Sequence, residues 1–340
     1  MSVLPEPRVV PLRGGPVLRW GLLGPGGIAH DFVATMHRNT DQRVVAVGSR
    51  SAERASRFAQ VHGVPRSYGS YRQLVADAEV DIVYIAAPNS EHRPLALLAI
   101  AAGKHVLVEK PMGVDADDAR AIASAASAAG VFAMEAMWSR FLPQTDVIAQ
   151  LLESGELGEV KLVTADFGAD FAEERGRPVF DPQLGGGALR DIGIYPVWFA
   201  RFVLGPPQQL YASGEMTDTG VDGQVAMVLS AAAGAQALLH TTMFVDTPTI
   251  ASISGTRARV ELRPPFLMPD GFTFITAEAS QQWTDDSGLR LRDGLAWQTT
   301  AVAQHVADGL TESPLHPLSE TIGILENLDT LRGQLHQQIH

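Results

Sequence analysis

Lys110 is the residue of this sequence whose setting most favours chemistry. It follows Glu109 and the apolar run at residues 106–108, and Pro111 ends the run. Such a run is typical of a buried parallel strand, and charged groups at the carboxyl end of a buried strand lie where open α/β sheets bind ligands. Burial beside a ligand moves the pKa of a lysine towards neutrality, which suits proton transfer. The competing interpretation is a solvated surface lysine, the usual setting of this residue type.

Asp191 and Tyr195 form a second candidate pair, in a segment that begins with three glycines at residues 185–187. Residues four apart share one face of a helix, and a carboxylate beside a phenol can position a substrate and move a proton. Because a lysine cation lowers the pKa of a nearby tyrosine from its usual value of about 10, we expect Lys110 and Tyr195 to act as one acid/base unit. The alternative is a helix with a capping aspartate and a core tyrosine.

A glycine pattern near the amino end predicts a dinucleotide site. Gly24, Gly26 and Ala29 form the pattern G-x-G-x-x-A between an apolar run and a helical pattern, which is the context that this fingerprint requires. Small residues let the main chain approach a pyrophosphate, which lies at the amino end of the helix. We therefore expect Gly24, Gly26, Gly27 and Ile28 to bind the cofactor. A tight turn without a ligand is the alternative.

The end of the next apolar run bears on which dinucleotide is bound. An acidic residue about 20 residues past the glycines holds the ribose hydroxyl of NAD, whereas this sequence has Ser49 and Arg50 there, with Arg54 one turn later. A guanidinium group matches the geometry of a 2′-phosphate. The sequence therefore predicts NADP(H) as the preferred cofactor and NAD(H) as the alternative. If neither arginine binds phosphate, both are solvated at the start of a helix.

Residues 86–92 place further polar groups at the carboxyl end of an apolar run. Ala87 and Pro88 lead into a helical pattern that Asn89 can cap. We expect Ala87, Pro88, Asn89 and His92 to line the cofactor site. The simpler interpretation of His92 is a polar residue in the first turn of a helix.

The elements that position these residues alternate in the first half of the chain. Strand-like runs at residues 17–23, 43–48, 80–86, 105–108 and 131–135 are separated by helical patterns at residues 28–36, 52–62, 88–102 and 116–129. Strands that alternate with helices imply parallel β-α-β units. The sequence therefore predicts a doubly wound Rossmann domain over residues 17–140. Residues 1–16 contain no apolar signal-peptide core, and we expect them to form a flexible arm.

The pattern changes after Pro143. Helical patterns at residues 145–153 and 187–204 flank a strand-like run at 160–171, and further strand-like runs follow at 209–215, 224–230, 235–244, 249–254, 258–262 and 272–277. Successive strands joined by short turns imply an antiparallel sheet. We therefore expect an α+β C-terminal domain, residues 141–340, with an open, mostly antiparallel sheet and closing helices at 297–310 and 319–337. The alternative for these final helices is that they pack back on the Rossmann domain. One face of this sheet would carry helices, and the other would be buried against a second subunit.

The composition argues against several classes of protein. A chain of 340 residues is long for one core, so two domains are expected. The 26 basic and 38 acidic residues give a formal charge of −12, which argues against nucleic acid and anionic membranes as partners. The absence of cysteine excludes disulfides and thiolate metal sites. No apolar run is long enough for a membrane span, and we expect a cytoplasmic protein without a metal site.

The order and spacing of these motifs resemble those of the Gfo/Idh/MocA oxidoreductases. The resemblance extends from residue 17 onward and rests on the glycine fingerprint, Pro88-Asn89 with His92, Glu109-Lys110-Pro111, and the glycine-rich segment with Asp191 and Tyr195. Residues 134–143, and the proline that follows Tyr195, are most similar to the branch of dimeric dihydrodiol dehydrogenases and NADP-dependent D-xylose dehydrogenases. Inositol dehydrogenases of the family usually have histidine where Tyr195 stands, which disfavours an inositol substrate.

The resemblance implies hydride transfer at a carbinol carbon and a role for each matched residue. Lys110 would hydrogen-bond to the reacting oxygen, Tyr195 would be the acid/base, and Asp191 would orient the substrate. Trp138 and Phe167 would wall the substrate pocket. Glu109 and Arg140 would lie near the nicotinamide end of the cofactor, and Ser49 and Arg50 would bind the 2′-phosphate. Lys110 and Trp138 would also contact the cofactor.

The implied substrate is small, neutral and polyhydroxylated: an aldose, a cyclic dihydrodiol or a related dicarbonyl. The implied assembly is a homodimer or higher homo-oligomer formed through the C-terminal sheet. One alternative is a cofactor-sensing regulator without turnover, which the presence of Lys110 and Tyr195 disfavours. A second is a hydride that moves out and back, as in redox-assisted elimination or epimerisation, and the sequence leaves this alternative open.

Overall fold

The computed structural model describes residues 4–171 and 176–337. Residues 1–3 of the predicted arm, residues 172–175, and residues 338–340 of the predicted C-terminal domain lie outside the described part. The chain forms two compact units, and each combines segments far apart in the sequence. Within the described residues, the first comprises Val9–Leu142 and Arg292–Ile322, and the second comprises residues 4–8, 143–171, 176–291 and 323–337.

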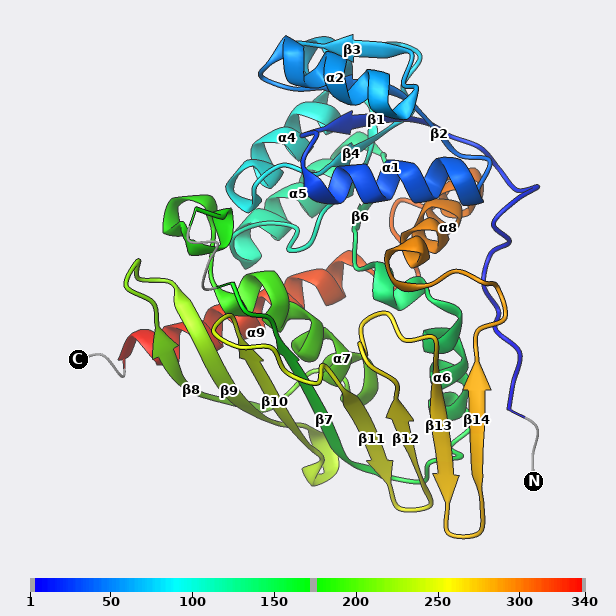
Figure 1. Cartoon of the computed structure of the whole chain (residues 1–340), viewed down its shortest axis with the longest axis vertical. Coiled ribbons are helices and arrows are strands. Elements are labelled where there is room, and N and C mark those ends of the chain that lie inside the picture. Colours follow the sequence, from blue (N-terminus) through cyan, green and yellow to red (C-terminus); the bar gives the residue numbers. More distant parts are fainter. Residues whose placement is uncertain (1–3, 172–175, 338–340) are drawn as a thin grey trace. The chain divides into compact units, whose positions relative to one another are not determined.

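The first unit is built on a parallel sheet of six strands (Figure 1). The strands are β1 (Arg19–Leu23), β2 (Arg43–Gly48), β3 (Arg66–Tyr68), β4 (Ile82–Ile85), β5 (His105–Val108) and β6 (Ala133–Glu135). Their order across the sheet is β3-β2-β1-β4-β5-β6, and every neighbouring pair is parallel. β4 is buried along its whole length, as expected for an apolar strand covered on both faces. This is the doubly wound order of dinucleotide-binding domains, and it confirms the predicted fold class.

Helices cover both faces of this sheet, with α1 on one side and α4 and α5 on the other (Figure 1). The helices of the unit are α1 (Gly27–Asn39), α2 (Ala52–His62), α3 (Tyr71–Val75), α4 (Asn89–Ala101), α5 (Ala116–Ala129) and α8 (Leu295–Ala307). Local sequence sets their ends. Ser51 accepts a hydrogen bond from the main chain at the start of α2, and that helix ends at Gly63 in the left-handed conformation.

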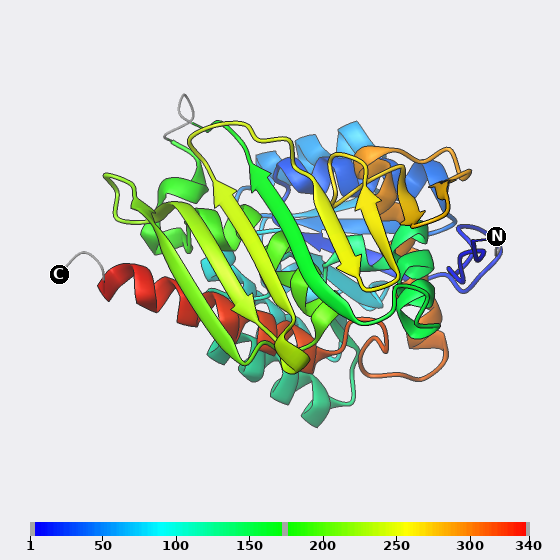
Figure 2. The same cartoon turned by 90° about the horizontal axis from the view of Figure 1, so that it is seen from below.

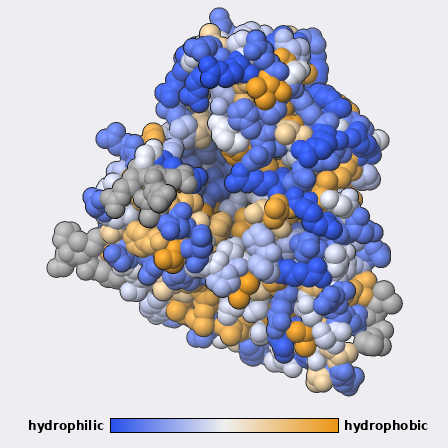
Figure 3. Space-filling model, in the orientation of Figure 1, coloured by the Kyte–Doolittle hydropathy of each residue, from blue (hydrophilic) through white to orange (hydrophobic). Residues whose placement is uncertain are grey.

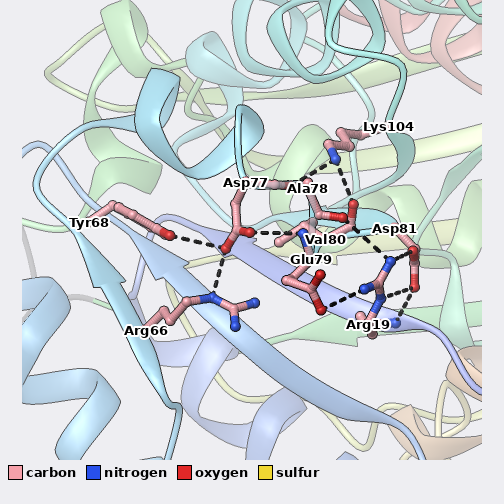
Figure 4. A network of polar contacts seen from close by, with 9 residues as sticks. All are labelled: Arg19, Arg66, Tyr68, Asp77, Ala78, Glu79, Val80, Asp81 and Lys104. Atoms are coloured by element: carbon pink, nitrogen blue, oxygen red, sulfur yellow. Dashed lines mark hydrogen bonds and ion pairs between the residues drawn. The ribbon is translucent and has the colours of Figure 1, made fainter.

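The sequence pattern predicts no element at residues 66–75, where the structure has β3 and α3. Elements of three and five residues are too short to show a hydrophobic period. Polar contacts hold this region (Figure 4). Asp77 accepts from Arg66 Nε at 2.7 Å and from the Tyr68 hydroxyl at 3.0 Å, and Lys104 donates to the Asp77 carbonyl at 2.8 Å. These contacts fix the connection that leads into β4.

The second unit is built on an open sheet of eight strands. The strands are β7 (Val160–Gly168), β8 (Gln209–Met216), β9 (Asp222–Ser230), β10 (Gln236–Thr242), β11 (Ala251–Gly255), β12 (Ala258–Leu262), β13 (Gly271–Thr276) and β14 (Ser280–Thr284). Their order is β14-β13-β12-β11-β7-β10-β9-β8. β7 and β10 pair in parallel and the other neighbours pair antiparallel. The prediction of an open, mostly antiparallel sheet is confirmed, although the sequence pattern does not predict β14, which is mostly polar.

Helices of the second unit cover one face of its sheet. They are α6 (Pro143–Glu153), α7 (Ile194–Leu204) and most of α9 (Leu318–Gln337). Gln334 of α9 accepts from the Ala212 N–H and donates to the Leu210 carbonyl, both at 2.8 Å, which ties this helix to β8. Figure 2 shows the opposite, uncovered face of the sheet.

Candidate active site

The turn between β1 and α1 requires glycine at Gly24 for two reasons. Its φ is +87°, and a Cβ atom there would lie 2.8 Å from the Ala86 carbonyl oxygen and from the Ala87 nitrogen. The turn therefore lies directly against the end of β4. Gly26 is the N-cap residue of α1, and no side chain caps this helix end. The first N–H groups of the helix can therefore bind an anion such as a pyrophosphate. The structure thus brings Gly24, Gly26, Gly27 and Ile28 to one helix start, beside Ala87.

The end of β2 carries the residues predicted to recognise the 2′-phosphate. Ser49 is buried, and its hydroxyl accepts from the Ser51 N–H at 3.2 Å, whereas Arg50 and Arg54 are exposed. The sequence pattern does not indicate a role for Tyr71, which lies at the start of the short helix α3. Burial raises the pKa of Tyr71, while the Arg50 and Arg54 cations lower it, so its hydroxyl lies within the field of both arginines. The glycine–serine pair directly before Tyr71 is the sequence signal from which this residue could have been identified.

Buried groups hold the main chain between the end of β5 and Lys110, which lies in a turn. The Glu109 N–H donates to the Ile85 carbonyl at 2.9 Å, and the Lys110 N–H donates to the Glu109 carboxylate at 3.2 Å. That carboxylate also accepts a short hydrogen bond from the Tyr84 hydroxyl. Burial raises the pKa of Glu109, while the hydroxyl of Tyr84 and the Lys110 cation lower it. Glu109 therefore supports the main chain beside Lys110.

The opposite side of the same turn contacts His92 of α4. The two ring nitrogens of His92 lie 2.7 Å from the Pro111 carbonyl and 2.8 Å from the Ala87 carbonyl. Burial lowers the pKa of His92 and the Lys110 cation lowers it too, while the two carbonyls and Glu135 raise it. His92 is 1% exposed. Its contacts join two of the strand ends that the sequence analysis assigns to the cofactor.

Trp138 and Arg140 lie on the turn that follows β6, Trp138–Phe141. The indole ring of Trp138 packs on Gly294, where a Cβ atom would lie 3.1 Å from Cζ3 of the ring. Gly294 precedes α8, so a segment more than 150 residues away in the sequence positions this aromatic side chain. The role of Gly294 could not be predicted from the sequence, because an isolated glycine gives no sign of its partner.

Asp191 and Tyr195 belong to the second unit, where the predicted helix at 187–204 begins as a π-turn. The π-turn covers Leu189–Gly193 and α7 follows it. Such turns are frequent at functional sites, and residues four apart still share a face across one. The ring of Phe167 lies 6.0 Å from that of Tyr195, centroid to centroid. The structure therefore brings together these two predicted substrate residues.

A buried carboxylate, which the sequence pattern does not indicate, holds the start of this π-turn. Asp222 is fully buried, and its Oδ2 accepts from the Leu189 N–H at 2.6 Å. A Cβ atom at Gly187 would lie 2.4 Å from its Oδ1, so the glycine-rich start makes room for the carboxylate. Burial raises the pKa of Asp222, while the Leu189 N–H and the Arg332 cation lower it. Asp222 follows a turn in the sequence, where an aspartate is ordinarily a surface residue.

Two family models match successive parts of the chain. Residues 18–137 match the oxidoreductase family with an NAD-binding Rossmann fold, and residues 146–261 match the GFO/IDH/MocA C-terminal domain. The chain belongs to the Gfo/Idh/MocA family of oxidoreductases. Membership confirms the resemblance stated from the motifs, and it makes the protein an NAD(P)-dependent dehydrogenase whose dinucleotide fold is the parallel sheet of the first unit.

Curated relatives in the Gfo/Idh/MocA family include trans-1,2-dihydrobenzene-1,2-diol dehydrogenases. The protein from Homo sapiens is 34% identical over 93% of this chain and 96% of its own length. The one from Xenopus laevis is 32% identical over 93% of this chain and 98% of its own. These relatives support the branch that residues 134–143 and Tyr195 indicate.

Solved structures of similar fold include a 3-ketoreductase and an aldose-aldose oxidoreductase. A 3-ketoreductase from Actinomadura kijaniata, in complex with NADP and TDP-benzene, is 26% identical, with a TM-score of 0.81 over 96% of this chain and 98% of its own. An aldose-aldose oxidoreductase from Caulobacter crescentus has a TM-score of 0.84 over 94% of this chain and 98% of its own. At 24% identity, the second shows likeness of fold alone.

The described residues include neither a membrane-spanning helix nor a cluster of metal ligands. Over residues 4–171 and 176–337, no helix has the length and apolar character needed to cross a membrane. Within the same ranges, no three histidine or acidic side chains are grouped so as to hold a metal ion.

Proposed function

We propose that this oxidoreductase uses NADP(H) to move a hydride to or from the carbinol carbon of a small sugar, cyclic dihydrodiol or related polyol or dicarbonyl. The observation that carries the proposal is the turn at Lys110, which follows β5 in a dinucleotide-binding sheet. The glycine turn of the same unit lies against the neighbouring strand end at Ala86 and Ala87. The names of the relatives, diol dehydrogenases and a 3-ketoreductase, support this class of substrate.

Each residue of the proposed site has a separate chemical task. When bound, the nicotinamide supplies or accepts the hydride. In the oxidising direction, the Tyr195 phenolate takes the proton of the substrate hydroxyl, and the Lys110 ammonium hydrogen-bonds to the oxygen on which negative charge develops. The same cation favours the phenolate form of the tyrosine. Asp191 accepts from a second hydroxyl of the substrate, and Trp138 and Phe167 exclude water.

The cofactor preference rests on the end of β2. Arg50 and Arg54 are exposed cations beside the buried Ser49, and the described residues at this strand end include no carboxylate in the position that favours a ribose hydroxyl. Arginine donors suit the three oxygens of a phosphate. The proposed preference is therefore for NADP(H).

The variant Lys110→Met tests the proposed chemistry. Loss of the ammonium group should leave NADPH binding within about threefold and lower turnover by about 10²- to 10⁴-fold, the usual contribution of a positioned acid/base group. Lys161→Met, at a half-exposed lysine of the second unit that pairs with Glu159, is the matched control and should keep wild-type rates. Turnover should be sought with aldoses, diols and dicarbonyls, using NADP⁺ and NADPH. Wild-type rates in Lys110→Met, or no turnover with the entire panel, would contradict the proposal.

The uncovered face of the eight-stranded sheet is proposed to bind a second copy of the chain. Its exposed apolar side chains include Tyr211 (56% exposed), Leu238 (46%), Ile250 (47%) and Val228 (36%). They border a shallow hollow of about 580 Å³ over β7 to β10. Figure 3 shows hydrophobic side chains gathered over the part of the sheet formed by β8, β9 and β10. Apolar sheet faces of this kind mark subunit interfaces.

A single substitution tests this assembly. Leu238→Asp places a charge at the centre of the apolar face, where burial in an interface would strongly disfavour it. The wild-type protein should scatter as a dimer or higher oligomer, and the variant should scatter as a monomer. A monomeric wild-type protein would refute the proposed interface.

A further inference from the structure

We propose that His92 and Glu135 are positioning residues for Lys110, because they fix the peptide group between Pro111 and Met112 from both of its polar atoms. This inference rests on the proposed function of Lys110. It concerns the main chain that follows Lys110, whereas Glu109 holds the main chain that precedes it.

The contacts to this peptide group come from two different elements. Its carbonyl oxygen lies 2.7 Å from Nδ1 of His92, in the first turn of α4. Its N–H donates to Oε1 of Glu135, the last residue of β6, at 2.9 Å. A peptide group is planar, so hydrogen bonds to its oxygen and its nitrogen together fix the orientation of the plane.

Both side chains are buried, so water does not compete for these hydrogen bonds. His92 is 1% exposed and Glu135 is 0% exposed. A carbonyl oxygen can only accept, so Nδ1 of His92 donates when it carries a proton. The charged groups that face the ring are the Lys110 cation, beyond β5, and the Glu135 carboxylate of β6.

Glu135 is itself anchored by a distant segment of the same unit. Its Oε2 accepts from Nε2 of His316 at 3.0 Å and from the Thr321 hydroxyl at 3.3 Å. Both partners are buried. A carboxylate that accepts three hydrogen bonds in a buried setting has little freedom to move, and it therefore gives the Met112 N–H a fixed partner.

Lys110 lies between two sets of contacts that hold the main chain. Glu109 and the Ile85 carbonyl hold the main chain before it, and the contacts to the Pro111–Met112 peptide hold the chain after it. These two sets of contacts fix the direction in which the side chain of Lys110 leaves the main chain. Loss of the His92 or Glu135 contact would let the main chain rotate, and a long side chain amplifies such a rotation at its tip.

The variant His92→Phe tests the inference, since it keeps an aromatic ring but removes both ring nitrogens. We expect kcat to fall about 10- to 100-fold, the effect of a misplacement of about 1 Å, while the Kd for NADPH stays within about threefold. His92→Gln keeps an N–H donor and should recover most of the loss. Glu135→Met should lower kcat in the same way, and Glu135→Gln, which keeps the acceptor for Met112, should lower it less.

His105→Phe is the matched control within the same unit. Nδ1 of His105 accepts the Phe132 N–H at 2.8 Å, at the amino end of β5 and therefore away from Lys110. This variant should lower the melting temperature and keep kcat. If His92→Phe does not fold, His92→Asn replaces it, because its shorter amide cannot span both carbonyls, and kcat should fall at least fivefold.

Three results separate the inference from the proposed function. If folded His92→Phe or His92→Asn keeps kcat within twofold while Lys110→Met is inactive, the positioning role is wrong and the proposed function stands. A loss of kcat in His105→Phe equal to that in His92→Phe would also overturn the positioning role. Wild-type turnover in Lys110→Met would instead overturn the proposed function on which the inference rests.

Discussion

Removal of the Asp222 carboxylate should weaken both the fold of the second unit and the rate of the reaction. Asp222 is fully buried, and its Oδ2 accepts from the Leu189 N–H at 2.6 Å. That N–H belongs to the first residue of the π-turn Leu189–Gly193, which carries Asp191 and leads into the helix of Tyr195. Asp222 therefore connects β9 to the start of the segment that presents the proposed acid/base.

The size of the effect follows from the contacts that each substitution removes. Asp222→Ala breaks a hydrogen bond to a charged group and leaves a buried N–H without its acceptor, so the free energy of unfolding should fall by about 3 kcal/mol. Arg332 Nε lies 3.9 Å from Oδ1, which is beyond hydrogen-bond distance, so no larger penalty is expected from the loss of this ion pair. Asp222→Asn keeps an acceptor and should cost about 1 kcal/mol.

Urea denaturation followed by circular dichroism measures the stability, and steady-state kinetics measures kcat. We expect kcat to fall about tenfold in Asp222→Ala, because a looser π-turn misplaces Asp191 and Tyr195. Asp285→Ala is the control. Asp285 is a buried carboxylate of the same unit that accepts from the Ser287 N–H and hydroxyl, in a loop after β14. A change in unfolding free energy below about 1 kcal/mol in Asp222→Ala, or an equal loss of kcat in the control, would refute the reasoning.

Three further predictions concern the first unit. Gly24→Ala should weaken NADPH binding at least tenfold in a fluorescence titration. The φ of +87° and a Cβ contact of 2.8 Å to Ala86 and Ala87 would force the turn to move. Wild-type affinity would show that this turn does not bind the cofactor. The double substitution of Arg50 and Arg54 by alanine should raise the Kd for NADPH at least tenfold, about 1.4 kcal/mol, and leave that for NADH within twofold by calorimetry. Equal weakening of both cofactors would mean that the arginines do not recognise the 2′-phosphate. Burial lowers the pKa of His37 from 6.5 to about 4, and its Nε2 accepts the Val44 N–H. Between these two pH values the unfolded chain therefore binds a proton at His37 that the folded chain does not. Because of this difference, the unfolding free energy should fall as the pH drops from 6.5 to 4. His37→Gln should flatten that slope in urea titrations across the same range, and an unchanged slope would rule out His37 as its cause.

Much of the first unit could be predicted from the sequence because its elements have strong local patterns. The bounds predicted for residues 43–48, 52–62, 105–108 and 116–129 agree with β2, α2, β5 and α5. Buried parallel strands are continuous apolar runs, and helix ends carry capping residues that can be recognised locally. β3, α3 and β14 could not be predicted, because three to five residues with few apolar side chains show no period.

The sequence by itself determined the family, the two-sheet architecture and the strand ends at which Gly24, Ser49 and Lys110 lie. Each of these depends on a few neighbouring residues: an apolar run, a glycine that must adopt a left-handed φ, or a charge directly after a strand. Such features are local, and they can be recognised without knowledge of what packs against them.

Only the tertiary structure decided what supports those residues. Glu135 and His316 are 181 positions apart and Asp222 and Leu189 are 33 apart, yet each pair is in hydrogen-bond contact. Tyr71 lies near Arg50 and Arg54 because two short elements bring it there. Contacts of this kind depend on how crossovers bring distant segments together in a packed interior. A local pattern does not encode that arrangement, so the supports of the proposed site become visible only in the folded chain.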